Sequence, residues 1–406
     1  MKSRWNDDDA KRAVEAYGAE GVNEDIALRV YTTRLIGRDP LLVLHGGGNT
    51  SVKTRAVDDL GQEHDVIAVK GSGADMAEIE PWGLPEVKLG PLREMRALAA
   101  LSDEAMVNTQ RLNLLNAAAP NPSVETLLHA FLPHKFVDHA HAAAVLSLVD
   151  QPDGTDLARE VYNGRMGFVP YIAPGFDLAK AAADVFDEKP DVEGLILHKH
   201  GIFTFGDTAQ DAYERMIEMV SLAEARLRQG RPVVFQTAHV PAEPASAADI
   251  APILRGACAI HHPGQDPTRF IAEFRSSPAI LDYVNGADLA SYSQRGVVTP
   301  DHIIRTKNKP LVVSAPDNGD LAAFARSVQA AVETYVAEYD IYFSRENEAV
   351  GGTKTKLDPM PRVILVPGVG LFGLGRSAKD ATIASDLAEN TVRVITDAEA
   401  IGRYEP

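Results

Sequence analysis

Residues 136–149 read FVDHAHAAAVLSLV, a stretch in which an apolar run leads directly into a His-x-His pair. The run from Lys135 to Asp138 predicts a short strand, and His139 and His141 follow it. Side chains two residues apart on a strand share one face, so both imidazole rings can reach the same ion. The pattern predicts two metal ligands at the end of a strand.

Residues 194–207 read GLILHKHGIFTFGD, in which a second apolar strand, Gly194–Leu197, ends in another histidine pair. Either His198 or His200 can serve as a third ligand, because both lie on the same face of an extended chain. Gly201 follows this pair, and a glycine lets a backbone pass close to a site. Residue chemistry alone leaves the choice between the two histidines open.

Three protein ligands with an open fourth position are typical of catalytic zinc sites, whereas structural zinc sites are closed and usually contain thiolates. Cys258 is the only cysteine of the chain, so a closed thiolate site is excluded. Imidazole ligands favour zinc, and cobalt, nickel or iron also suit them. We therefore expect an enzyme that uses a divalent metal.

Glu125 precedes His139 by fourteen residues. Ser123 is predicted to cap a helix that runs to Phe131. A carboxylate in a first helical turn can simply favour the helix dipole. It can also act as a general base beside a metal-polarised carbonyl group. The spacing does not decide between these two interpretations.

Two glycine-rich segments follow predicted strands. The first, Gly46-Gly47-Gly48-Asn49-Thr50-Ser51, follows a strand expected at Leu41–Leu44, and the second, Lys70-Gly71-Ser72-Gly73, follows one at Asp65–Val69. Glycine permits conformations that direct successive N–H groups at one anion, and hydroxyl groups add donors. Both segments suit a phosphate group, and each alone is equally compatible with an ordinary tight turn.

Composition limits the class of protein. The chain has 406 residues, which suggests two or three domains, and its 45% hydrophobic and 24% charged residues are those of a soluble globular protein. A net charge of −17 argues against general nucleic-acid binding. The apolar runs are too short to span a membrane, and the single cysteine and charged N-terminus fit the cytoplasm.

Helical patterns and short apolar strands alternate along the chain, which predicts an α/β fold. We expect a catalytic domain at residues 1–236, a linker rich in proline and alanine at 237–248, and a smaller α/β domain of unknown role at 249–406. No internal repeat is evident. The remaining expected helices are Asp25–Ile36, Pro91–Ala100, Thr208–Arg228, Asp320–Phe343 and Lys379–Asn390, and the remaining strands are Arg362–Val366 and Val392–Ile395.

Residues 367–373, PGVGLFG, match the Gly-x-Gly-x-x-Gly pattern of dinucleotide-binding domains. Too little chain follows Gly373 for a complete nucleotide-binding fold. We therefore interpret these glycines as a tight turn with close helix–sheet packing.

The order of these motifs resembles that of the class II aldolase/adducin family over about residues 25–230. The motifs are Gly48-Asn49-Thr50-Ser51-Val52-Lys53, Gly71-Ser72-Gly73, Ser123-x-Glu125-x-x-x-His129, His139-x-His141 and His200-Gly201. The whole chain resembles the aldolase part of bifunctional rhamnulose-1-phosphate aldolase/alcohol dehydrogenases, without their short-chain dehydrogenase module. The resemblance implies a three-layer α-β-α domain with a central sheet, plus the smaller C-terminal domain.

The resemblance also implies roles for particular residues. Glu125 is the expected catalytic acid/base, and the zinc ligands are His139, His141 and His200, which is the reason for choosing His200 over His198. The substrate phosphate is expected at Gly48, Asn49, Ser72, Gly73 and Ser123. Val124 replaces the second serine that is usual before the glutamate. A tyrosine can serve as proton donor in this family, and the choice between Tyr162 and Tyr171 stays open.

The activity implied is zinc-dependent cleavage of a ketose 1-phosphate, similar to rhamnulose or fuculose 1-phosphate. The products are dihydroxyacetone phosphate and an aldehyde, formed through a metal-stabilised enediolate. A sugar-phosphate dehydratase or epimerase of the same family is the alternative, and a non-catalytic adducin-like interaction module is a third. The expected partner is a small sugar phosphate, with no nucleic acid and no membrane, and the resemblance implies a homo-oligomer, a tetramer.

Overall fold

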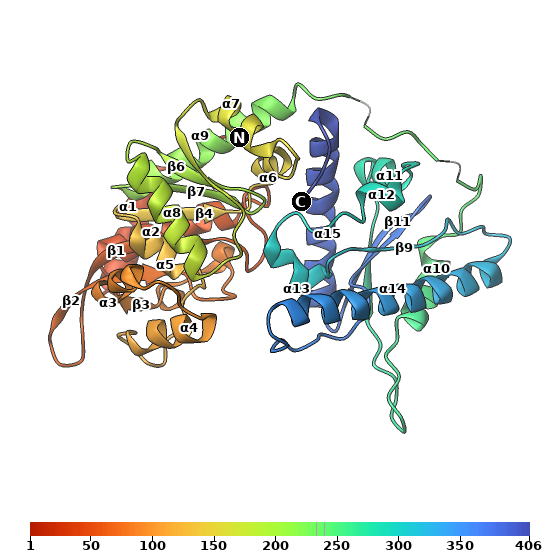
Figure 1. Cartoon of the computed structure of the whole chain (residues 1–406), viewed down its shortest axis with the longest axis horizontal. Coiled ribbons are helices and arrows are strands. Elements are labelled where there is room, and N and C mark those ends of the chain that lie inside the picture. Colours follow the sequence, from red (N-terminus) through yellow and green to blue (C-terminus); the bar gives the residue numbers. More distant parts are fainter. Residues whose placement is uncertain (233, 239) are drawn as a thin grey trace. The chain divides into compact units, whose positions relative to one another are not determined.

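The computed structural model describes residues 1–232, 234–238 and 240–406 (Figure 1). The chain divides into two compact units, Met1–Gly230 and Arg231–Pro406, which are called unit 1 and unit 2 below. The expected linker at 237–248 includes His239, which lies outside the described residues. The domain boundaries expected from the sequence stay a prediction.

Unit 1 is built on a seven-stranded sheet with the strand order β3-β2-β1-β4-β7-β6-β5. Strand β4 lies inside the sheet, because it pairs antiparallel with β1 on one side and with β7 on the other. The strands are β1 Asn49–Val57, β2 Glu63–Val69, β3 Glu86–Lys88, β4 Phe136–Ala140, β5 Met166–Val169, β6 Gly194–Leu197 and β7 Gly201–Gly206.

Helices cover both faces of this sheet. They are α1 Asp7–Ala19, α2 Glu24–Gly37, α3 Leu89–Glu94, α4 Asp103–Leu112, α5 Thr126–Phe131, α6 Ala143–Val149, α7 Gly154–Tyr162, α8 Phe176–Glu188 and α9 Ala209–Leu227, with short 3₁₀ turns at Met76–Glu78, Pro81–Gly83 and Met95–Ala97. Neighbouring strand residues serve different layers: Val137 joins the core cluster of α5 and α8, whereas Phe136 joins that of α2 and α9. Unit 1 therefore has three layers, as expected.

Unit 2 has a smaller, four-stranded sheet with the order β8-β11-β10-β9. A separate core, which includes Leu254, Phe324, Val328 and Phe372, fills the space between this sheet and its helices. The elements are α10 Ala247–Ala257, β8 Ile271–Arg275, α11 Pro278–Val284, α12 Leu289–Tyr292, a 3₁₀ turn Pro300–His302, α13 Ile303–Thr306, β9 Leu311–Val312, α14 Leu321–Ala349, β10 Val363–Val366, β11 Gly370–Gly375 and α15 Ala378–Ile401.

Two predicted strands are wrong. Residues 41–44 form a turn and irregular backbone, because Asp39 bends the chain: its carbonyl accepts from the N–H groups of Leu42 and Val43. The expected strand at Val392–Ile395 lies inside the helix α15. Its β-branched residues are buried on that helix, so packing overrides their strand preference. The other predicted strands and helices are present with shifted ends. The helix expected at Lys379–Asn390 continues to Ile401 in α15, and the one expected at Pro91–Ala100 is α3, which ends at Glu94 before the 3₁₀ turn Met95–Ala97.

The predicted cap at Ser123 is also wrong. Helix α5 begins at Thr126, and Glu125 occupies the N-cap position. Residues 123–126 form a turn instead, because the Thr126 N–H group donates to the Ser123 carbonyl oxygen over 3.1 Å. The Ser123 hydroxyl accepts from the Glu125 N–H group over 3.3 Å and from the Asn49 amide of the neighbouring strand β1 over 3.0 Å.

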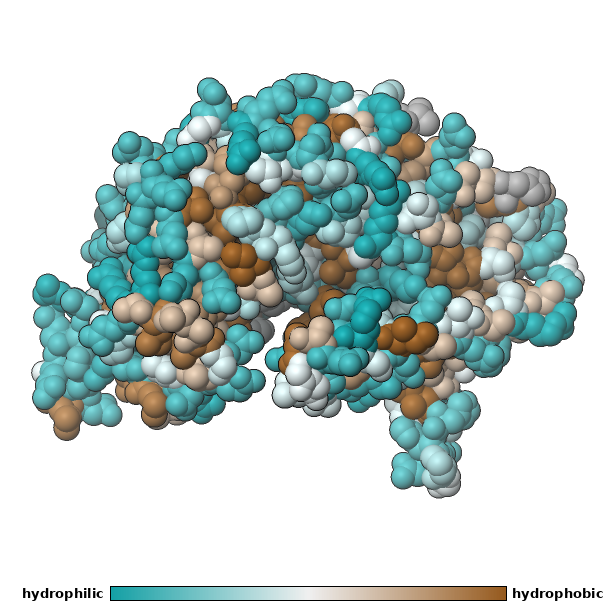
Figure 2. Space-filling view, viewed as in Figure 1, coloured by the Kyte–Doolittle hydropathy of each residue, from teal (hydrophilic) through white to brown (hydrophobic). Residues whose placement is uncertain are grey.

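The face of the molecule in Figure 2 is largely hydrophilic, in keeping with the net charge of −17. Among the described residues, no helix combines the length and the apolar character that crossing a membrane requires.

Candidate metal centre

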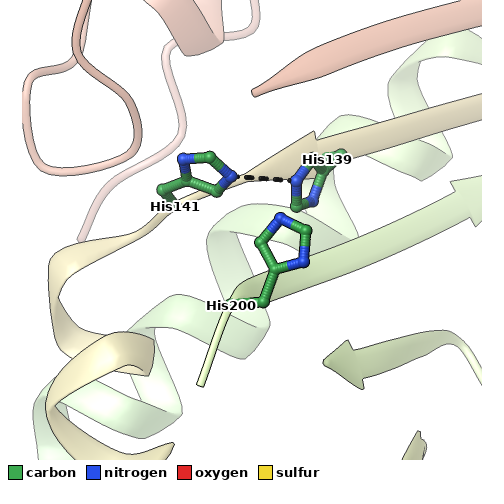
Figure 3. A group of neighbouring side chains, drawn as sticks. All are labelled: His139, His141 and His200. Carbon is green, nitrogen blue, oxygen red and sulfur yellow. Dashed lines mark hydrogen bonds between the residues drawn. The ribbon is translucent and has the colours of Figure 1, made fainter. Parts of the chain in front are cut away.

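Three buried histidines meet at the ends of strands β4 and β7. His139 lies on β4, His141 directly follows that strand, and His200 directly precedes β7 (Figure 3). One nitrogen of each ring lies within 4.8 Å of the others. The Nε2 atoms of His139 and His141 are 3.0 Å apart. The antiparallel pairing of β4 with β7 therefore brings together residues that are far apart in the sequence.

The turn between β6 and β7 places His200 in this cluster. Strand β6 ends at Leu197, so His198 and His200 lie on a turn and do not share the face of a strand. Lys199 has a positive φ of 57°, which lets the chain reverse within this short turn. The cluster of described residues that could hold a metal contains His200 and does not include His198.

Hydrogen bonding fixes the ring of His139 for metal binding. Its Nδ1–H group donates to the Ile202 carbonyl oxygen over 3.0 Å, and its ring stacks on Phe203 with the centroids 4.1 Å apart. Burial, and next the neighbouring His200, hold the pKa of His139 well below its usual value. The ring is therefore neutral, with the lone pair on Nε2 directed at the cluster, as in a metal ligand. This donor set fits a divalent metal.

Glu125 lies against the three histidines. One carboxylate oxygen, Oε2, is 3.3 Å from Nε2 of His139, and the other, Oε1, is 3.5 Å from Nε2 of His200. The Asn49 amide donates to Oε2 over 2.7 Å and to the Ser123 hydroxyl oxygen over 3.0 Å. The carboxylate is thus held beside the histidines from one side.

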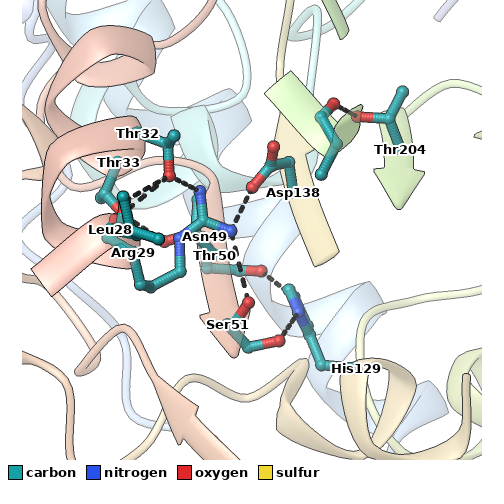
Figure 4. Close-up of polar contacts among 11 residues, drawn as sticks. Leu28, Arg29, Thr32, Thr33, Asn49, Thr50, Ser51, His129, Asp138 and Thr204 are labelled. Carbon is teal, nitrogen blue, oxygen red and sulfur yellow. Dashed lines mark hydrogen bonds and ion pairs between the residues drawn. The ribbon is translucent and has the colours of Figure 1, made fainter. Parts of the chain in front are cut away.

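His129, to which the sequence assigned no role, supports this arrangement (Figure 4). Because the Asn49 oxygen can only accept, the Nε2–H group of His129 must donate to it, over 2.5 Å. The other ring nitrogen, Nδ1, then accepts from the Ser51 hydroxyl over 2.8 Å. Burial lowers the pKa of His129 well below its usual value, so the ring is neutral, as this pattern requires.

A buried ion pair lies one residue from the histidine cluster. Arg29 of α2 and Asp138 of β4 are both fully buried, and their closest nitrogen and oxygen atoms are 2.6 Å apart (Figure 4). Asp138 lies next to His139 in the chain, with its side chain on the other face of the sheet. The sequence did not predict this pair, because an arginine in a helix has no local signal for a partner more than a hundred residues away.

Three loops meet beside Glu125. The Lys70 ammonium group donates to the Gly46 carbonyl over 3.0 Å and to the Ala74 carbonyl over 2.8 Å, and the Lys70 carbonyl accepts from the Ser123 N–H group.

Gly48 has a positive φ of 60°, and a Cβ atom there would lie 2.7 Å from the His139 carbonyl oxygen. Ser72 and Gly73 are exposed at the edge of this junction. The structure thus brings all five residues of the expected phosphate site to one region.

The two candidate tyrosines differ in exposure. Tyr162 is fully buried at the end of α7, and burial raises its pKa, whereas Tyr171 is 52% exposed. The Tyr162 phenol is therefore a weaker acid than usual and is shielded from solvent, so it is poorly suited to give a proton to a substrate that enters from solvent. Neither tyrosine has a hydrogen bond to the histidine cluster among the described contacts.

Two family descriptions match the chain. "Class II Aldolase and Adducin N-terminal domain" matches residues 28–227, and "Aldolase class II, second domain" matches residues 245–406. The N-terminal class II aldolase domain of a conserved protein from Thermoplasma acidophilum is 41% identical, covering 56% of this chain and 100% of that chain, with a TM-score of 0.50.

Two further proteins are similar to the chain. "Uncharacterized oxidoreductase YuxG" of Bacillus subtilis (strain 168) is 33% identical over 412 residues, which cover 100% of this chain. The chain spans only 57% of the length of that relative. L-fuculose-1-phosphate aldolase from Thermus thermophilus is 20% identical, covering 50% of this chain and 95% of that chain, with a TM-score of 0.33.

Unit 1 is a mixed α/β domain with a central sheet and three clustered histidines, and the class II aldolase descriptions match this part of the chain. The chain belongs to the class II aldolase/adducin family.

Proposed function

We propose that this chain is a zinc-dependent aldolase that cleaves a ketose 1-phosphate, similar to rhamnulose or fuculose 1-phosphate, to dihydroxyacetone phosphate and an aldehyde. The observation that carries the proposal is the position of the Glu125 carboxylate, 3.3 Å from His139 and 3.5 Å from His200. A base beside three metal ligands suits proton transfer at a carbon next to a polarised carbonyl group.

His139, His141 and His200 would hold the metal. When bound, a divalent cation supplies Lewis-acid stabilisation of the negative charge that develops as a carbon–carbon bond breaks. The three histidine rings are buried, and desolvation strengthens such electrostatic stabilisation.

Glu125 would move the proton. The Asn49 amide holds Oε2, whereas Oε1 has no hydrogen-bond partner among the described residues. We therefore assign the proton transfer to Oε1, with Oε2 serving to fix the orientation of the carboxylate. His129 fixes Asn49 in turn, so that the Asn49 N–H₂ group, and not its oxygen, faces the carboxylate.

The three loops joined by Lys70 would hold the phosphate. Backbone N–H groups of glycine-rich loops and nearby hydroxyl groups bind anions in a protein of net negative charge without a large basic patch. Gly48, Asn49, Ser72, Gly73 and Ser123 lie in this region, and anchoring the phosphate there would fix the reacting carbons against the metal and Glu125.

The test uses the purified, zinc-loaded protein and a set of ketose 1-phosphates, with release of dihydroxyacetone phosphate measured by a coupled assay. Glu125→Gln should retain one metal per chain but lose at least about 100-fold in kcat, the lower range for a general acid or base. Glu188→Gln, a change of an exposed glutamate on α8, is the matched control and should leave kcat unchanged.

Full activity of Glu125→Gln would contradict the role of Glu125. Failure of the zinc-loaded protein to release dihydroxyacetone phosphate from any of these substrates would contradict the aldolase proposal. Loss of water from the sugar phosphate, detected by mass spectrometry, would instead indicate the dehydratase alternative.

A further inference from the structure

The sheet of unit 2 repeats one half of the sheet of unit 1. The strand order β4-β7-β6-β5 in unit 1 corresponds to β8-β11-β10-β9 in unit 2. The pairing directions also agree: the first two pairs are antiparallel, and the last pair is parallel in both units. Strand order and direction alone recur in unrelated mixed sheets, so a common origin needs a more specific correspondence.

The register of the strands makes the correspondence specific. Phe203 of β7 lies opposite His139 and Leu195, and Phe372 of β11 lies opposite Phe274 and Ile364. When the two phenylalanines are aligned, the segments 201–212 and 370–381 read GIFTFGDTAQDA and GLFGLGRSAKDA, with no gap. With this alignment, each residue of β4 or β6 that pairs with β7 corresponds to a residue of β8 or β10 that pairs with β11.

The flanking helices agree to the residue. Helix α6 begins three positions after β4 ends, at Ala143, and α11 begins three positions after β8 ends, at Pro278; both helices span seven residues. Thr208 caps α9 by accepting from the N–H group of the third residue after it, and Ser377 caps α15 in the same way.

The surroundings of Gly201 and Gly370 show which residues of unit 2 correspond to the histidines of unit 1. A Cβ atom on Gly201 would lie 2.6 Å from the Ala140 carbonyl oxygen and 3.1 Å from ring atoms of both His139 and His141. On Gly370 it would lie 2.4 Å from the Arg275 carbonyl oxygen, 3.1 Å from the ring of Phe274 and 3.3 Å from Cβ of Ser276. Phe274 thus stands for His139, and Ser276 for His141.

The third position follows from the same alignment. His200 directly precedes Gly201, and Val369 directly precedes Gly370. The turns agree as well, since Lys199 and Gly368 have positive φ values of 57° and 79° at corresponding positions. No internal repeat is evident in the sequence, because the correspondence lies in strand register and turn geometry and few side chains share it.

We propose that residues 271–401 are a second copy of the metal-carrying half of unit 1, and that Phe274, Ser276 and Val369 mark a latent site for a divalent metal. A phenyl ring, a hydroxyl and an isopropyl group supply no imidazole ligand there. The wild-type chain should accordingly bind one metal ion, in unit 1 alone. The expectation of one metal ion per wild-type chain rests on the proposed function. The assignment of the latent site in unit 2 is independent of that function.

The described residues of unit 2 contain no counterpart of β1, which begins at Asn49, or of the turn that carries Glu125. Among the described residues, β8 is an edge strand, whereas its counterpart β4 pairs with β1. A metal restored in unit 2 would therefore lack the base and the phosphate loops. We expect it to bind without adding aldolase activity.

The experiment restores the ligands in the full-length chain by the triple substitution Phe274→His, Ser276→His and Val369→His. Phe274 is 41% exposed and Ser276 is exposed, so two of the three changes leave the buried core intact. The matched control places the third histidine at Pro367, which corresponds to His198, instead of at Val369. Metal per chain is measured by elemental analysis after dialysis against zinc, and circular dichroism checks folding.

We expect one metal for the wild type, two for the triple variant and one for the control. A folded triple variant that binds no more metal than the wild type, or a control that binds one ion more than the wild type, would overturn the inference. In a His139→Ala/His141→Ala background the triple variant should still bind one metal, so the latent site is tested even if unit 1 binds none. No metal in the wild type would contradict the proposed function only.

A wild-type crystal soaked in zinc gives an independent test. Anomalous scattering should show a peak at His139, His141 and His200 and none at Phe274, Ser276 and Val369. A peak at the second position would show that it already binds metal and would overturn its assignment as latent.

Discussion

Asn49 illustrates how one side chain can hold several others in place. The resemblance to the family assigns it to the substrate phosphate, and in the structure its amide contacts Glu125, Ser123 and His129. An amide has both a donor and an acceptor end, so a neutral His129 that donates to the oxygen forces the N–H₂ group toward the carboxylate. The orientation of Glu125 therefore depends on His129, a residue fully buried from solvent.

We predict that His129→Leu lowers kcat about 10-fold or more while metal content and KM change little, since loss of such a supporting partner typically costs about 10- to 100-fold. The variant leaves the Asn49 oxygen without its donor, so the amide can turn over. Steady-state kinetics with elemental analysis measure both effects.

His129→Gln is the control, because its side-chain amide can still donate to Asn49 and should recover part of the lost activity. Equal kcat values for His129→Leu and the wild type would show that Asn49 is held without His129.

At the scale of the element, helix α5 shows why so short a segment is fixed. It spans six residues, all buried, between Glu125 and Leu132. Lys53 of β1 holds its far end, since the ammonium group donates to the His129 carbonyl over 2.8 Å and to the His134 carbonyl over 2.7 Å. Charged donors satisfy helix-terminal carbonyls that have no partner within the helix.

Lys53 predicts a pH dependence of stability. Burial lowers its pKa from 10.5 to about 7 in the folded chain. Between these values the unfolded chain binds more protons, so the Lys53 contribution to the free energy of unfolding is complete above pH 10.5 and is lost as the pH falls through 7. The free energy of unfolding of the wild type minus that of Lys53→Met should rise from about pH 7 to about pH 9.5 by on the order of 1 kcal/mol per pH unit.

Urea denaturation at several pH values measures this difference. Below about pH 7 the difference should be constant, and Lys11→Met, at an exposed lysine of α1, should show no such slope. A flat difference across the whole range would mean that Lys53 titrates normally in the folded chain.

Local patterns predicted most elements and the residues that meet at the site, because strand ends, glycine turns and a long amphipathic helix are visible in short windows of sequence. They failed where tertiary contacts decide. Asp39 bends the chain at Leu41–Leu44, and the buried face of α15 holds Val392–Ile395 in a helix. Neither the Arg29–Asp138 pair nor the role of His129 could be predicted, since each depends on partners from distant strands.

At the scale of the whole molecule, the two units share a strand framework but not its chemistry. A bound metal stabilises the conformation that holds it, by about 2.7 kcal/mol at a free concentration about 100 times its Kd. Because the wild-type ligands are all in unit 1, this stabilisation should act on β4 and β7 and should leave the corresponding strands of unit 2 unaffected.

We predict that removing the metal with a chelator speeds hydrogen exchange in peptides from residues 136–149 and 194–206 and leaves peptides from 271–284 and 363–375 unchanged. Exchange measured by mass spectrometry compares each peptide with its counterpart in the other unit. An equal change in both sets would show that the metal stabilises the chain as a whole, and no change in either would argue against a metal in unit 1.

Gly201 follows the metal-site histidine His200, and its counterpart in unit 2 shows what this glycine does. A glycine directly after a histidine strengthened the prediction of a metal site, as though the site required it. Gly370 has kept the same close approach to a carbonyl oxygen in a unit whose ligand positions hold phenylalanine, serine and valine. The glycine is therefore required where β7 approaches β4 and where β11 approaches β8, whether or not the neighbouring side chains can hold a metal. In related chains, histidines at the positions of His139, His141 and His200 should distinguish a unit that binds metal from one that does not, whereas the glycine should be present in both.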